Sequence, residues 1–255
     1  MYKPFDLTGR KALVTGGNGG IGLGMARALL QAGADVAIWG SNPEKTAAAV
    51  DELQVEGGVV QGFVCDVGNE QTVRESLATT VKALGGLDAC FANAGVSSAP
   101  VPIADMSAEE FRRVQRVNVD GVFYTFREAA KVMQQQGSGG SLIATASTAA
   151  VEGAARNSHY GASKGAVTSY VRALAVELAR YQIRVNSILP GWIETDMTAR
   201  AMADERFASN VMPRIPARRW GTIEDFGGIA VYLMSDASTY TTGEQFIIDG
   251  GYTKF

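Results

Sequence analysis

Seven short stretches of this chain are almost entirely apolar, and the segments between them are amphipathic. The apolar stretches cover residues 11–15, 35–39, 59–64, 87–92, 141–146, 183–189 and 245–248. Because polar residues do not alternate regularly within them, they are typical of strands that are covered on both faces in a parallel sheet. Helical periodicity fills the intervals, and the later helices are expected at 69–84, 107–135, 158–181 and 222–234.

Signals for helix ends accompany this alternation. After the first apolar stretch, Ile21 and Leu29 fall on one helical face, and Gly33 follows where a helix commonly stops. After the second stretch, Asn42 and Pro43 combine a capping residue with an early proline, a pair that begins many helices. Both signals predict that a helix follows each strand closely.

The alternation of strand and helix predicts the fold class. We expect an α/β protein with a Rossmann-like, doubly wound parallel sheet of about seven strands and helices on both faces. No linker rich in proline, serine or charge divides the sequence, and it contains no internal repeat, so residues 1–255 are expected to form one domain. The least patterned stretch, 192–216, is expected to be a flexible flap on the substrate side.

Charge and cysteine content narrow the possible partners. The net charge is −3 and no basic run is present, which argues against nucleic acid or an anionic membrane surface. The N-terminus lacks a secretory apolar stretch, and no run approaches about 18 apolar residues. Cys65 and Cys90 lie far apart in apolar surroundings, which suits a reducing compartment and indicates no metal site. We therefore expect a cytoplasmic protein that binds small molecules.

A glycine-rich turn follows the first predicted strand and leads directly into the first helix. It reads Thr15-Gly16-Gly17-Asn18-Gly19-Gly20-Ile21-Gly22. Glycines let the backbone turn sharply and let a pyrophosphate approach the free N–H groups of the helix. Two glycine spacings fit: Gly17-x-Gly19-x-x-Gly22 and Thr15-Gly16-x-x-x-Gly20-x-Gly22. Either spacing predicts dinucleotide binding, whereas a tight turn without a ligand is the structural alternative.

Tyr160 and Lys164 stand four residues apart at the start of a long helical segment, so they share one helical face. A phenol with an ordinary pKa near 10 is a poor base at neutral pH, and a neighbouring ammonium favours its ionised form. The pair therefore makes a plausible acid–base unit. Ser147 ends the fifth apolar stretch, where its hydroxyl can donate to a substrate oxygen. Asn118, in a mostly apolar helical stretch, must find hydrogen-bond partners of a structural or catalytic kind.

Taken together, these motifs resemble those of the short-chain dehydrogenase/reductase family over essentially the whole chain. The resemblance rests on the second glycine spacing and on motifs that follow in the family's order: Asn93-Ala94-Gly95, Asn118, Ser147, the Tyr160/Lys164 pair, Pro190-Gly191 and Asp249-Gly250-Gly251. It implies an NAD(P)-dependent oxidoreductase that moves a hydride between the cofactor and a secondary alcohol or ketone, and it implies a homotetramer.

The resemblance also assigns roles. Tyr160 would be the general acid or base, Lys164 would lower its pKa and hold the nicotinamide ribose, Ser147 would position the substrate oxygen, and Asn118 would hold a water that links Lys164 to solvent. Asp66 would contact the adenine amino group and Thr195 the carboxamide. The other residues expected at the cofactor are Gly16, Asn18, Gly20, Ile21, Gly22, Ser41, Asn42, Val67, Asn93, Ala94, Gly95, Pro190, Gly191 and Ile193.

The choice between NAD and NADP depends on the end of the second strand. Relatives that prefer NAD usually carry a carboxylate there for the ribose 2′-hydroxyl. This chain reads Trp39-Gly40-Ser41-Asn42 instead, without an acid, and also without the arginine common in NADP enzymes. The missing carboxylate favours NADP slightly over NAD, with Ser41, Asn42 and Lys45 near the 2′-phosphate.

Substrate and rival functions stay open at this point. A small polyol, sugar or cyclic ketone is favoured; a 3-oxoacyl-carrier-protein reductase would need a basic docking patch, for which Arg127, Lys131 and Arg172 form no clear cluster. A nicotinamide-sensing binding protein is the alternative outside catalysis, and nucleotide-sugar epimerisation is another reaction on this fold. His159 is expected at a cap or a pocket wall. Trp192 and the methionines Met197, Met202 and Met212 are expected either at the substrate or in helix packing.

Overall fold

The computed structural model describes residues 3–254, and its centre is a seven-stranded sheet in which all neighbouring strands are parallel. The strand order is β3-β2-β1-β4-β5-β6-β7. The predicted doubly wound sheet is therefore confirmed. The strands are β1 (Lys11–Thr15), β2 (Asp35–Gly40), β3 (Val60–Val64), β4 (Ala89–Ala92), β5 (Gly140–Thr145), β6 (Ile183–Pro190) and β7 (Gln245–Ile248).

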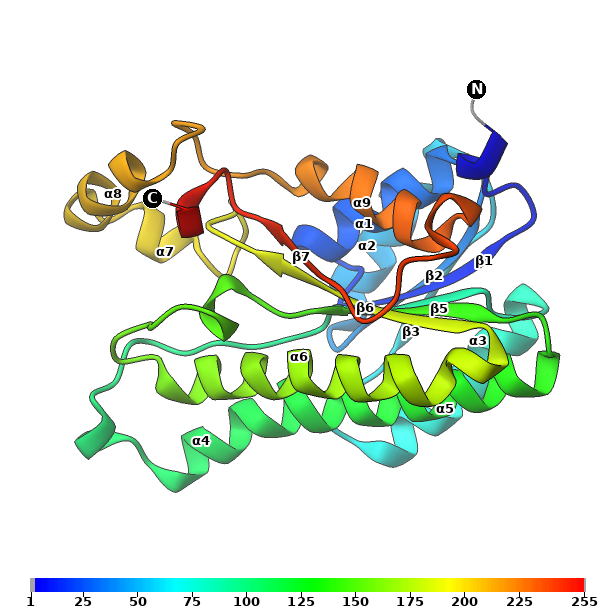
Figure 1. Ribbon diagram of the computed structural model, residues 1–255, viewed down its shortest axis with the longest axis horizontal. Helices are drawn as coiled ribbons and strands as arrows, with labels where there is room; N and C mark the ends of the chain where they lie inside the picture. The colour runs from blue at the N-terminus through cyan, green and yellow to red at the C-terminus, as the bar shows by residue number, and fades with distance from the viewer. Residues whose placement is uncertain (1–2, 255) are drawn as a thin grey trace.

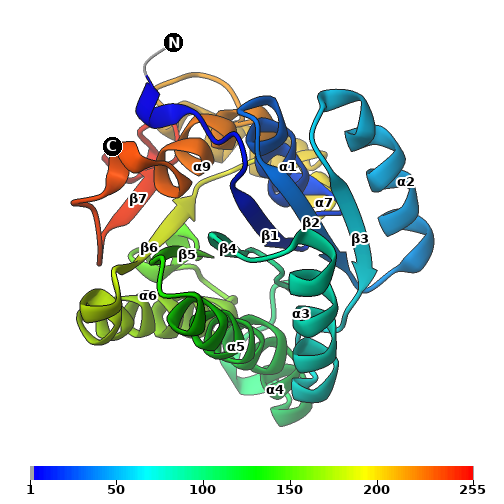
Figure 2. The ribbon, with the colours of Figure 1, turned by 90° about the vertical axis from the view of Figure 1, so that its right-hand side faces the viewer.

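Helices cover both faces of the sheet, as Figures 1 and 2 show. One face carries α1 (Gly20–Gln31), α2 (Pro43–Leu53) and α9 (Gly227–Met234). The other carries α3 (Glu70–Leu84), α4 (Ala108–Gln115), α5 (Gly121–Gln136) and α6 (Ser158–Leu178). Among residues 3–254, none of the helices has both the length and the hydropathy that crossing a membrane requires.

The two-sided covering explains the unbroken apolar stretches. Leu13 of β1 packs into the cluster beneath α3, α5 and α6, whereas its neighbours Ala12 and Val14 pack into the cluster beneath α1 and α9. All three side chains are fully buried. Successive residues of a strand point to opposite faces, so a strand between two helical layers needs apolar residues at every position.

One strand departs from this rule. In β3, exposed and covered positions alternate, and the side chain of Val64 is 56% exposed. The expectation of a strand covered on both faces is wrong here because β3 is an edge strand, bonded only to β2. The apolar residues of β3 do not indicate, from the sequence, whether the strand lies at the centre or at the edge of the sheet.

The helix expected at 107–135 is interrupted in its middle. The π-helical turn Arg116–Asp120 separates α4 from α5. A turn of this kind inserts an extra residue and re-aims the side chains within it, and it occurs often at functional sites. The least patterned stretch, 192–216, contains two short helices, α7 (Ala199–Met202) and α8 (Glu205–Val211). Its flexibility remains a prediction.

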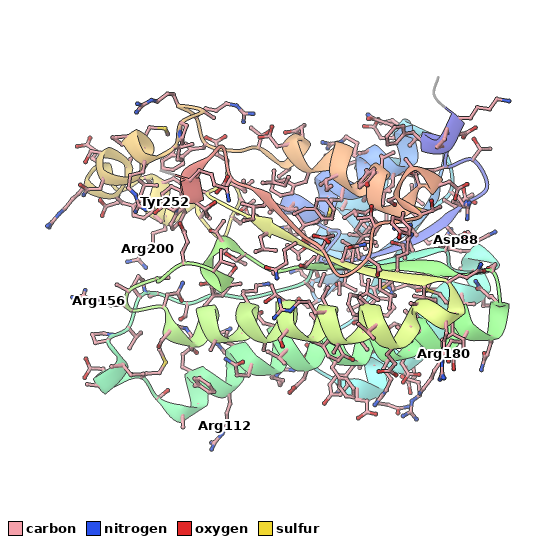
Figure 3. The ribbon with its side chains drawn as sticks, in the orientation of Figure 1. Asp88, Arg112, Arg156, Arg180, Arg200 and Tyr252 are labelled. Carbon is pink, nitrogen blue, oxygen red and sulfur yellow. The ribbon has the colours of Figure 1, made fainter. Side chains whose placement is uncertain are left out.

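The topology sends all strands toward the same end of the molecule. Arg156 and Arg200 project at that end, whereas Asp88 and Arg180 lie at the opposite end (Figure 3). Because β1 and β4 are neighbours whose helices α1 and α5 cover opposite faces, the sheet has a topological switch point between them. Ligands of open α/β sheets bind at the carboxyl ends of the strands at such a point.

Candidate active site

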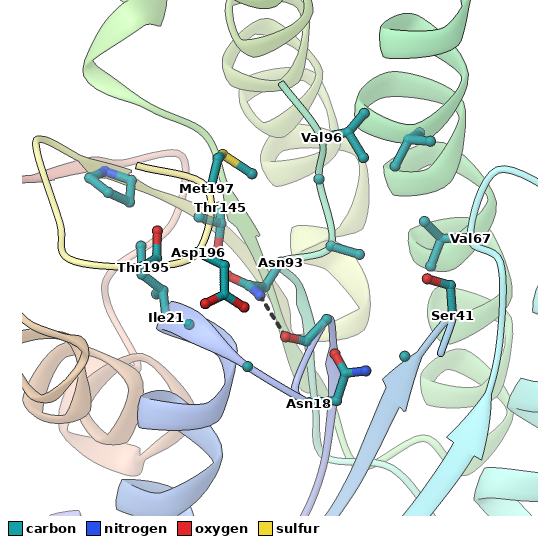
Figure 4. A pocket seen from close by; sticks show the side chains of 18 of the residues that line it. Asn18, Ile21, Ser41, Val67, Asn93, Val96, Thr145, Thr195, Asp196 and Met197 are labelled. Carbon is teal, nitrogen blue, oxygen red and sulfur yellow. Dashed lines mark hydrogen bonds between the residues drawn. The ribbon is translucent and has the colours of Figure 1, made fainter. Parts of the chain in front are cut away.

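A cavity of about 560 Å³ lies at the carboxyl ends of the strands. In Figure 4, Ser41 and Val67 stand on one side of it, and Thr195 and Met197 stand on the other. Most residues expected from the sequence line it together: Gly16, Asn18, Gly20, Ile21, Ser41, Asp66, Val67, Asn93, Ala94, Gly95, Ser147, Tyr160, Lys164, Pro190, Gly191, Ile193 and Thr195.

The glycine-rich turn is built on the second of the two glycine spacings. Gly16 and Gly20 have φ angles of +64° and +52°, a region that residues with a Cβ rarely adopt. At Gly22, a Cβ would lie 2.3 Å from the main-chain oxygen of Gly16. Gly17 and Gly19 have no such positive φ. The φ angles at Gly16 and Gly20 and the packing at Gly22 therefore fit Thr15-Gly16-x-x-x-Gly20-x-Gly22. Gly17 is restricted by packing as well, since a Cβ there would lie 2.7 Å from Ile38 Cγ2 and 2.9 Å from the main-chain oxygen of Val14.

Asn93, at the end of β4, holds the turn in place. Its side-chain amide donates to the main-chain oxygen of Thr15 at 3.1 Å, and its own N–H donates to Thr15 Oγ1 at 3.0 Å. The N–H of Ala94 donates to the same hydroxyl at 3.0 Å. Adjacent strands β1 and β4 are thus joined just beyond their ends, beside the cavity (Figure 4).

The turn fits a dinucleotide. Helix α1 begins at Gly20, and Gly19 before it has no side chain that could cap the first N–H groups. Those N–H groups and the helix dipole together form an anion site. Because the glycines leave no Cβ in the way, a pyrophosphate could approach the backbone directly. The turn therefore suits a dinucleotide because the start of α1 is uncapped and the backbone beside it is formed by glycines.

Asn18 binds the end of β2 to the same turn. Its Nδ2 donates to Thr46 Oγ1 on α2 at 3.1 Å. The amide packs so closely on Gly40 that a Cβ there would lie 2.0 Å from Asn18 Nδ2. A larger residue at position 40 would therefore require Asn18 and Thr46 to move, since Thr46 Oγ1 would also lie 2.4 Å from the Cβ. Ser41 is the next residue along the chain that lines the cavity.

Asp66 pairs with a residue that the sequence analysis did not single out. Its Oδ2 accepts from Arg116 Nη1 at 2.8 Å, and its Oδ1 accepts from the Gly68 N–H at 2.9 Å. Partial burial works to raise the pKa of Asp66, but these two bonds outweigh it and hold the pKa below its usual value. Arg116 and Arg113, three residues earlier, both line the cavity. The spacing of these two arginines, which places them on one helical face, is the sequence feature that could have predicted their position at the cavity.

Tyr160 and Ser147 meet above the end of β5. Burial raises the pKa of the Tyr160 phenol, and the hydrogen bond with the Ser147 hydroxyl opposes the rise only in part. The net direction is opposite to the lowering that the sequence led us to expect from Lys164. A phenol with a raised pKa is protonated at neutral pH, which is the state a proton donor needs.

Lys164 is buried beside Tyr160. Its side chain is 4% exposed, and its Nζ donates to the main-chain oxygen of Thr145 at 2.7 Å. The Nζ lies 5.6 Å from the centre of the Tyr160 ring. Burial lowers the pKa of Lys164 to about 8, because the charged ammonium loses its hydration. The expected proximity of the pair is therefore present.

Asn118 lies behind the cavity wall, in the π-helical turn. Its Oδ1 accepts from the Val96 N–H at 2.8 Å, and its Nδ2 donates to Val96 O at 2.9 Å and to Ser163 Oγ at 3.0 Å. Both amide protons are therefore used. Gly95 keeps space open between Asn118 and Lys164, since a Cβ there would lie 3.3 Å from Asn118 Oδ1 and 3.4 Å from Lys164 Nζ.

Two residues expected at the cofactor do not line the cavity. Gly22 lies beneath the turn, where its missing Cβ permits close packing on Gly16. Asn42 caps α2 instead, with its Oδ1 accepting from the Lys45 N–H at 2.7 Å. The capping signal in Asn42-Pro43 is thus confirmed, and a contact of Asn42 with the cofactor stays a prediction. Lys45, three residues later, lines the cavity.

The substrate side is only partly as expected. Met197 lines the cavity, but Met202 and Met212 do not. Trp192 packs in a separate aromatic cluster, with its ring 4.7 Å from that of Phe207. His159 is fully buried, and its Nε2 lies 2.6 Å from Ser98 Oγ. This histidine supports the wall segment around Ser98 and does not line the cavity.

Comparison with known proteins gives the same assignment. The family model described as enoyl-(acyl carrier protein) reductase matches residues 16–253. The chain is 36% identical to a 2,5-dichloro-2,5-cyclohexadiene-1,4-diol dehydrogenase of Sphingobium indicum, covering 97% of this chain and 98% of that protein. It is 34% identical to a gluconate 5-dehydrogenase of Gluconobacter oxydans, with 98% and 96% covered.

Comparison with solved structures supports the same family. A short-chain type dehydrogenase/reductase from Mycobacterium marinum superposes with a TM-score of 0.94 at 42% identity, covering 98% of both chains. A structure from Agrobacterium tumefaciens that contains bound NADP has a TM-score of 0.91 at 33% identity, covering 99% of both chains. The cavity geometry and these relatives lead to one conclusion: the chain belongs to the short-chain dehydrogenase/reductase family, the NAD(P)-binding oxidoreductases that act on CH–OH groups.

Proposed function

We propose that this enzyme interconverts a small secondary alcohol and its ketone, that it prefers NADP(H), and that Tyr160 transfers the proton. The observation that carries the proposal is that Tyr160, Ser147 and Lys164 line the same cavity as the glycine-rich turn. A protein that only senses the dinucleotide would have no need for this constellation. Bound NADP(H) supplies or accepts the hydride.

Each residue of the constellation has a distinct task. The Tyr160 hydroxyl donates a proton to the substrate oxygen during reduction and, as phenolate, removes it during oxidation. The Ser147 hydroxyl donates a hydrogen bond to the same oxygen as negative charge develops there. The Lys164 ammonium favours the phenolate electrostatically and holds the nicotinamide ribose. Asn118 orders a water near Gly95, through which a proton reaches Lys164 from solvent.

The preference for NADP(H) follows from the residues around the adenosine end. A Cβ at position 40 would lie 2.0 Å from Asn18 Nδ2 and 2.4 Å from Thr46 Oγ1, so a carboxylate at the end of β2 would require both side chains to move. Ser41 and Lys45 line the cavity next to it. A hydroxyl and an ammonium suit a 2′-phosphate, which accepts hydrogen bonds and carries negative charge.

A small neutral substrate suits the opposite end of the cavity. Val96 and Met197 line it near the constellation, and they offer apolar contact rather than charge. The cyclic diol of the Sphingobium relative is a small neutral molecule of this kind, so we propose a polyol, a sugar or a cyclic ketone.

An acyl-carrier-protein substrate fits less well, although the matching family model is described by one. Arg127 and Lys131 on α5 both pair with Glu128, at 2.8 Å each, and Arg127 also pairs with Glu70 at 2.7 Å. Cations neutralised in this way do not form the basic patch that an acidic carrier domain would need.

We further propose a homo-oligomer, with a tetramer as the family expectation, and a cytoplasmic location. Phe123 on α5 and Tyr170 on α6 form an aromatic contact at the outer face of these helices, and Phe123 is 40% exposed while Val176 is 82% exposed. Exposed apolar groups of this kind commonly lie in interfaces. Both cysteines are free thiols, which suits a reducing compartment.

The proposed function is tested with a panel of alcohols and ketones and with NADPH and NADH, followed at the absorbance band of the reduced nicotinamide. Turnover of at least one small cyclic or polyhydroxy substrate, faster with NADPH than with NADH, is the expected result. If no such substrate reacts but an acyl thioester does, the substrate class is wrong. Faster turnover with NADH would contradict the cofactor preference alone.

A further inference from the structure

An ion pair joins the two sides of the cavity. Lys45 belongs to α2, and Asp196 belongs to the segment that follows β6, 151 residues later in the chain. Lys45 Nζ donates to Asp196 Oδ2 at 2.6 Å. Both residues line the cavity, and the Asp196 carboxylate points into it (Figure 4). The pair is therefore a bridge across the cofactor site.

The bridge lies over the glycine-rich turn. A Cβ on Gly19 would be 3.0 Å from Lys45 Nζ, and a Cβ on Gly20 would be 3.3 Å from Thr195 Cγ2. Lys45 thus lies next to Gly19, and Thr195, the residue before Asp196, lies next to Gly20. The carboxylate of Asp196 places a negative charge where the turn is otherwise suited to phosphate, and Lys45 balances that charge.

We propose that Asp196 is a specificity-determining residue: its carboxylate and the 2′-phosphate of NADP(H) compete for Lys45. Binding of the 2′-phosphate transfers the ammonium from Asp196 to the cofactor and releases the start of the 192–216 segment from α2. This inference rests on the proposed preference for NADP(H). NAD(H) has no 2′-phosphate, so it binds without breaking the bridge and gains nothing from Lys45.

The bridge is weak enough to be exchanged. The side chain of Lys45 is 48% exposed and that of Asp196 is 89% exposed, so water screens both charges. Ion pairs between exposed side chains contribute little free energy, so this pair changes an affinity by at most about fivefold. A doubly charged phosphate that accepts hydrogen bonds from the same ammonium is the stronger partner.

The experiment compares the dissociation constants of 2′,5′-ADP and 5′-AMP by titration calorimetry. The two probes differ only in the 2′-phosphate and contain no nicotinamide, so they report on the adenosine end without turnover. Lys45→Met should weaken 2′,5′-ADP about tenfold or more and leave 5′-AMP unchanged. Asp196→Asn should tighten 2′,5′-ADP about two- to fivefold and leave 5′-AMP unchanged. Lys82→Met on α3 and Asp51→Asn on α2, both exposed, are the charge-matched controls.

The double variant decides whether Asp196 acts through Lys45. In the Lys45→Met background, Asp196→Asn should no longer affect 2′,5′-ADP. If Asp196→Asn tightens both probes equally, the carboxylate repels the shared 5′-phosphate, and the competition does not exist. If the wild type binds 2′,5′-ADP more tightly but neither variant changes this, the inference fails while the NADP(H) preference stands. Equal wild-type affinity for both probes removes the preference itself.

Discussion

The ammonium of Lys164 lies 5.6 Å from the centre of the Tyr160 ring, and in the wall of one cavity the lysine is buried and the tyrosine is partly buried. Burial acts on them in opposite directions: it raises the pKa of the phenol and lowers that of the amine to about 8. Each group is therefore pushed toward its neutral form. The charges needed for catalysis must stabilise each other within the cavity.

Replacement of Tyr160 by phenylalanine should reduce turnover by about a hundredfold or more, because the only change is the loss of the proton-transferring hydroxyl. NADPH affinity should stay within about twofold, since the ring and its packing remain. Energy transfer from Trp39, a fully buried residue next to the cavity, to bound NADPH measures that affinity. Tyr170→Phe, on the outer part of α6, is the control. A fully active Tyr160→Phe enzyme would rule out the mechanism.

The lowered pKa of Lys164 predicts a pH dependence of stability. In the unfolded chain the lysine binds a proton up to its ordinary pKa of 10.5, whereas in the folded chain it loses the proton near 8. Between these values the unfolded state binds more protons, so the free energy of unfolding should rise with pH, by up to about 3 kcal/mol. Urea unfolding of wild type and Lys164→Met between about pH 8 and pH 9.5 isolates this contribution, because all other groups titrate in both proteins. Parallel pH profiles would show that the amine is not desolvated.

Asn118 should contribute to stability as well as to catalysis. Asn118→Ala leaves the N–H and C=O of Val96, a partly buried residue, without their partner, which should cost about 1–3 kcal/mol in the free energy of unfolding. The wall segment around Val96 should also loosen, which would raise KM for the substrate. Chemical denaturation and steady-state kinetics measure the two effects. Asn210→Ala, at an exposed position of α8, serves for comparison and should change neither.

Gly22→Ala should weaken NADPH binding by about tenfold or more, because the new Cβ would displace the main-chain oxygen of Gly16 and with it the phosphate-binding turn. The matched substitution is Gly228→Ala in α9, where a Cβ meets open space. That variant should bind NADPH normally and gain about 0.5–1 kcal/mol in helix stability. Cofactor titrations and thermal unfolding of both proteins provide the comparison. Normal binding by Gly22→Ala would show that the turn does not contact the cofactor.

Most of the fold and a large part of the cavity could be predicted from local sequence patterns. Unbroken apolar stretches indicated the strands of a parallel sheet. The carboxyl ends of parallel strands lie at the same edge of the sheet, whichever face the connecting helices cover. The position of a strand in the sheet leaves no such local mark, which is why β3 was expected to be covered on both faces although it lies at an edge. The π-helical turn at Asn118 was also invisible, because it inserts one residue without changing the helical pattern on either side.

Contacts between distant segments were the main omission. Asp66 could be placed at the cavity from the strand before it, but its partner Arg116 comes from another helix 50 residues later. Asn42 carried two compatible meanings, a helix cap and a phosphate contact, and the main-chain geometry of α2 makes it a cap. The ion pair between Lys45 and Asp196 joins residues that are 151 positions apart, so no local sequence pattern indicates it.

The tight packing of Asn18 on Gly40 constrains how this enzyme could change its cofactor. An aspartate introduced at position 40 to recruit NAD would collide with Asn18 before it reached any ribose. The positions are therefore mutationally coupled: Asn18 and Thr46, whose Oγ1 would lie 2.4 Å from the same Cβ, would both have to make room, and a smaller residue at 18 would also remove its bond to Thr46 on α2. If the proposed preference for NADP(H) holds, the easier route to an NAD enzyme from this scaffold is through position 41, where Ser41 is exposed.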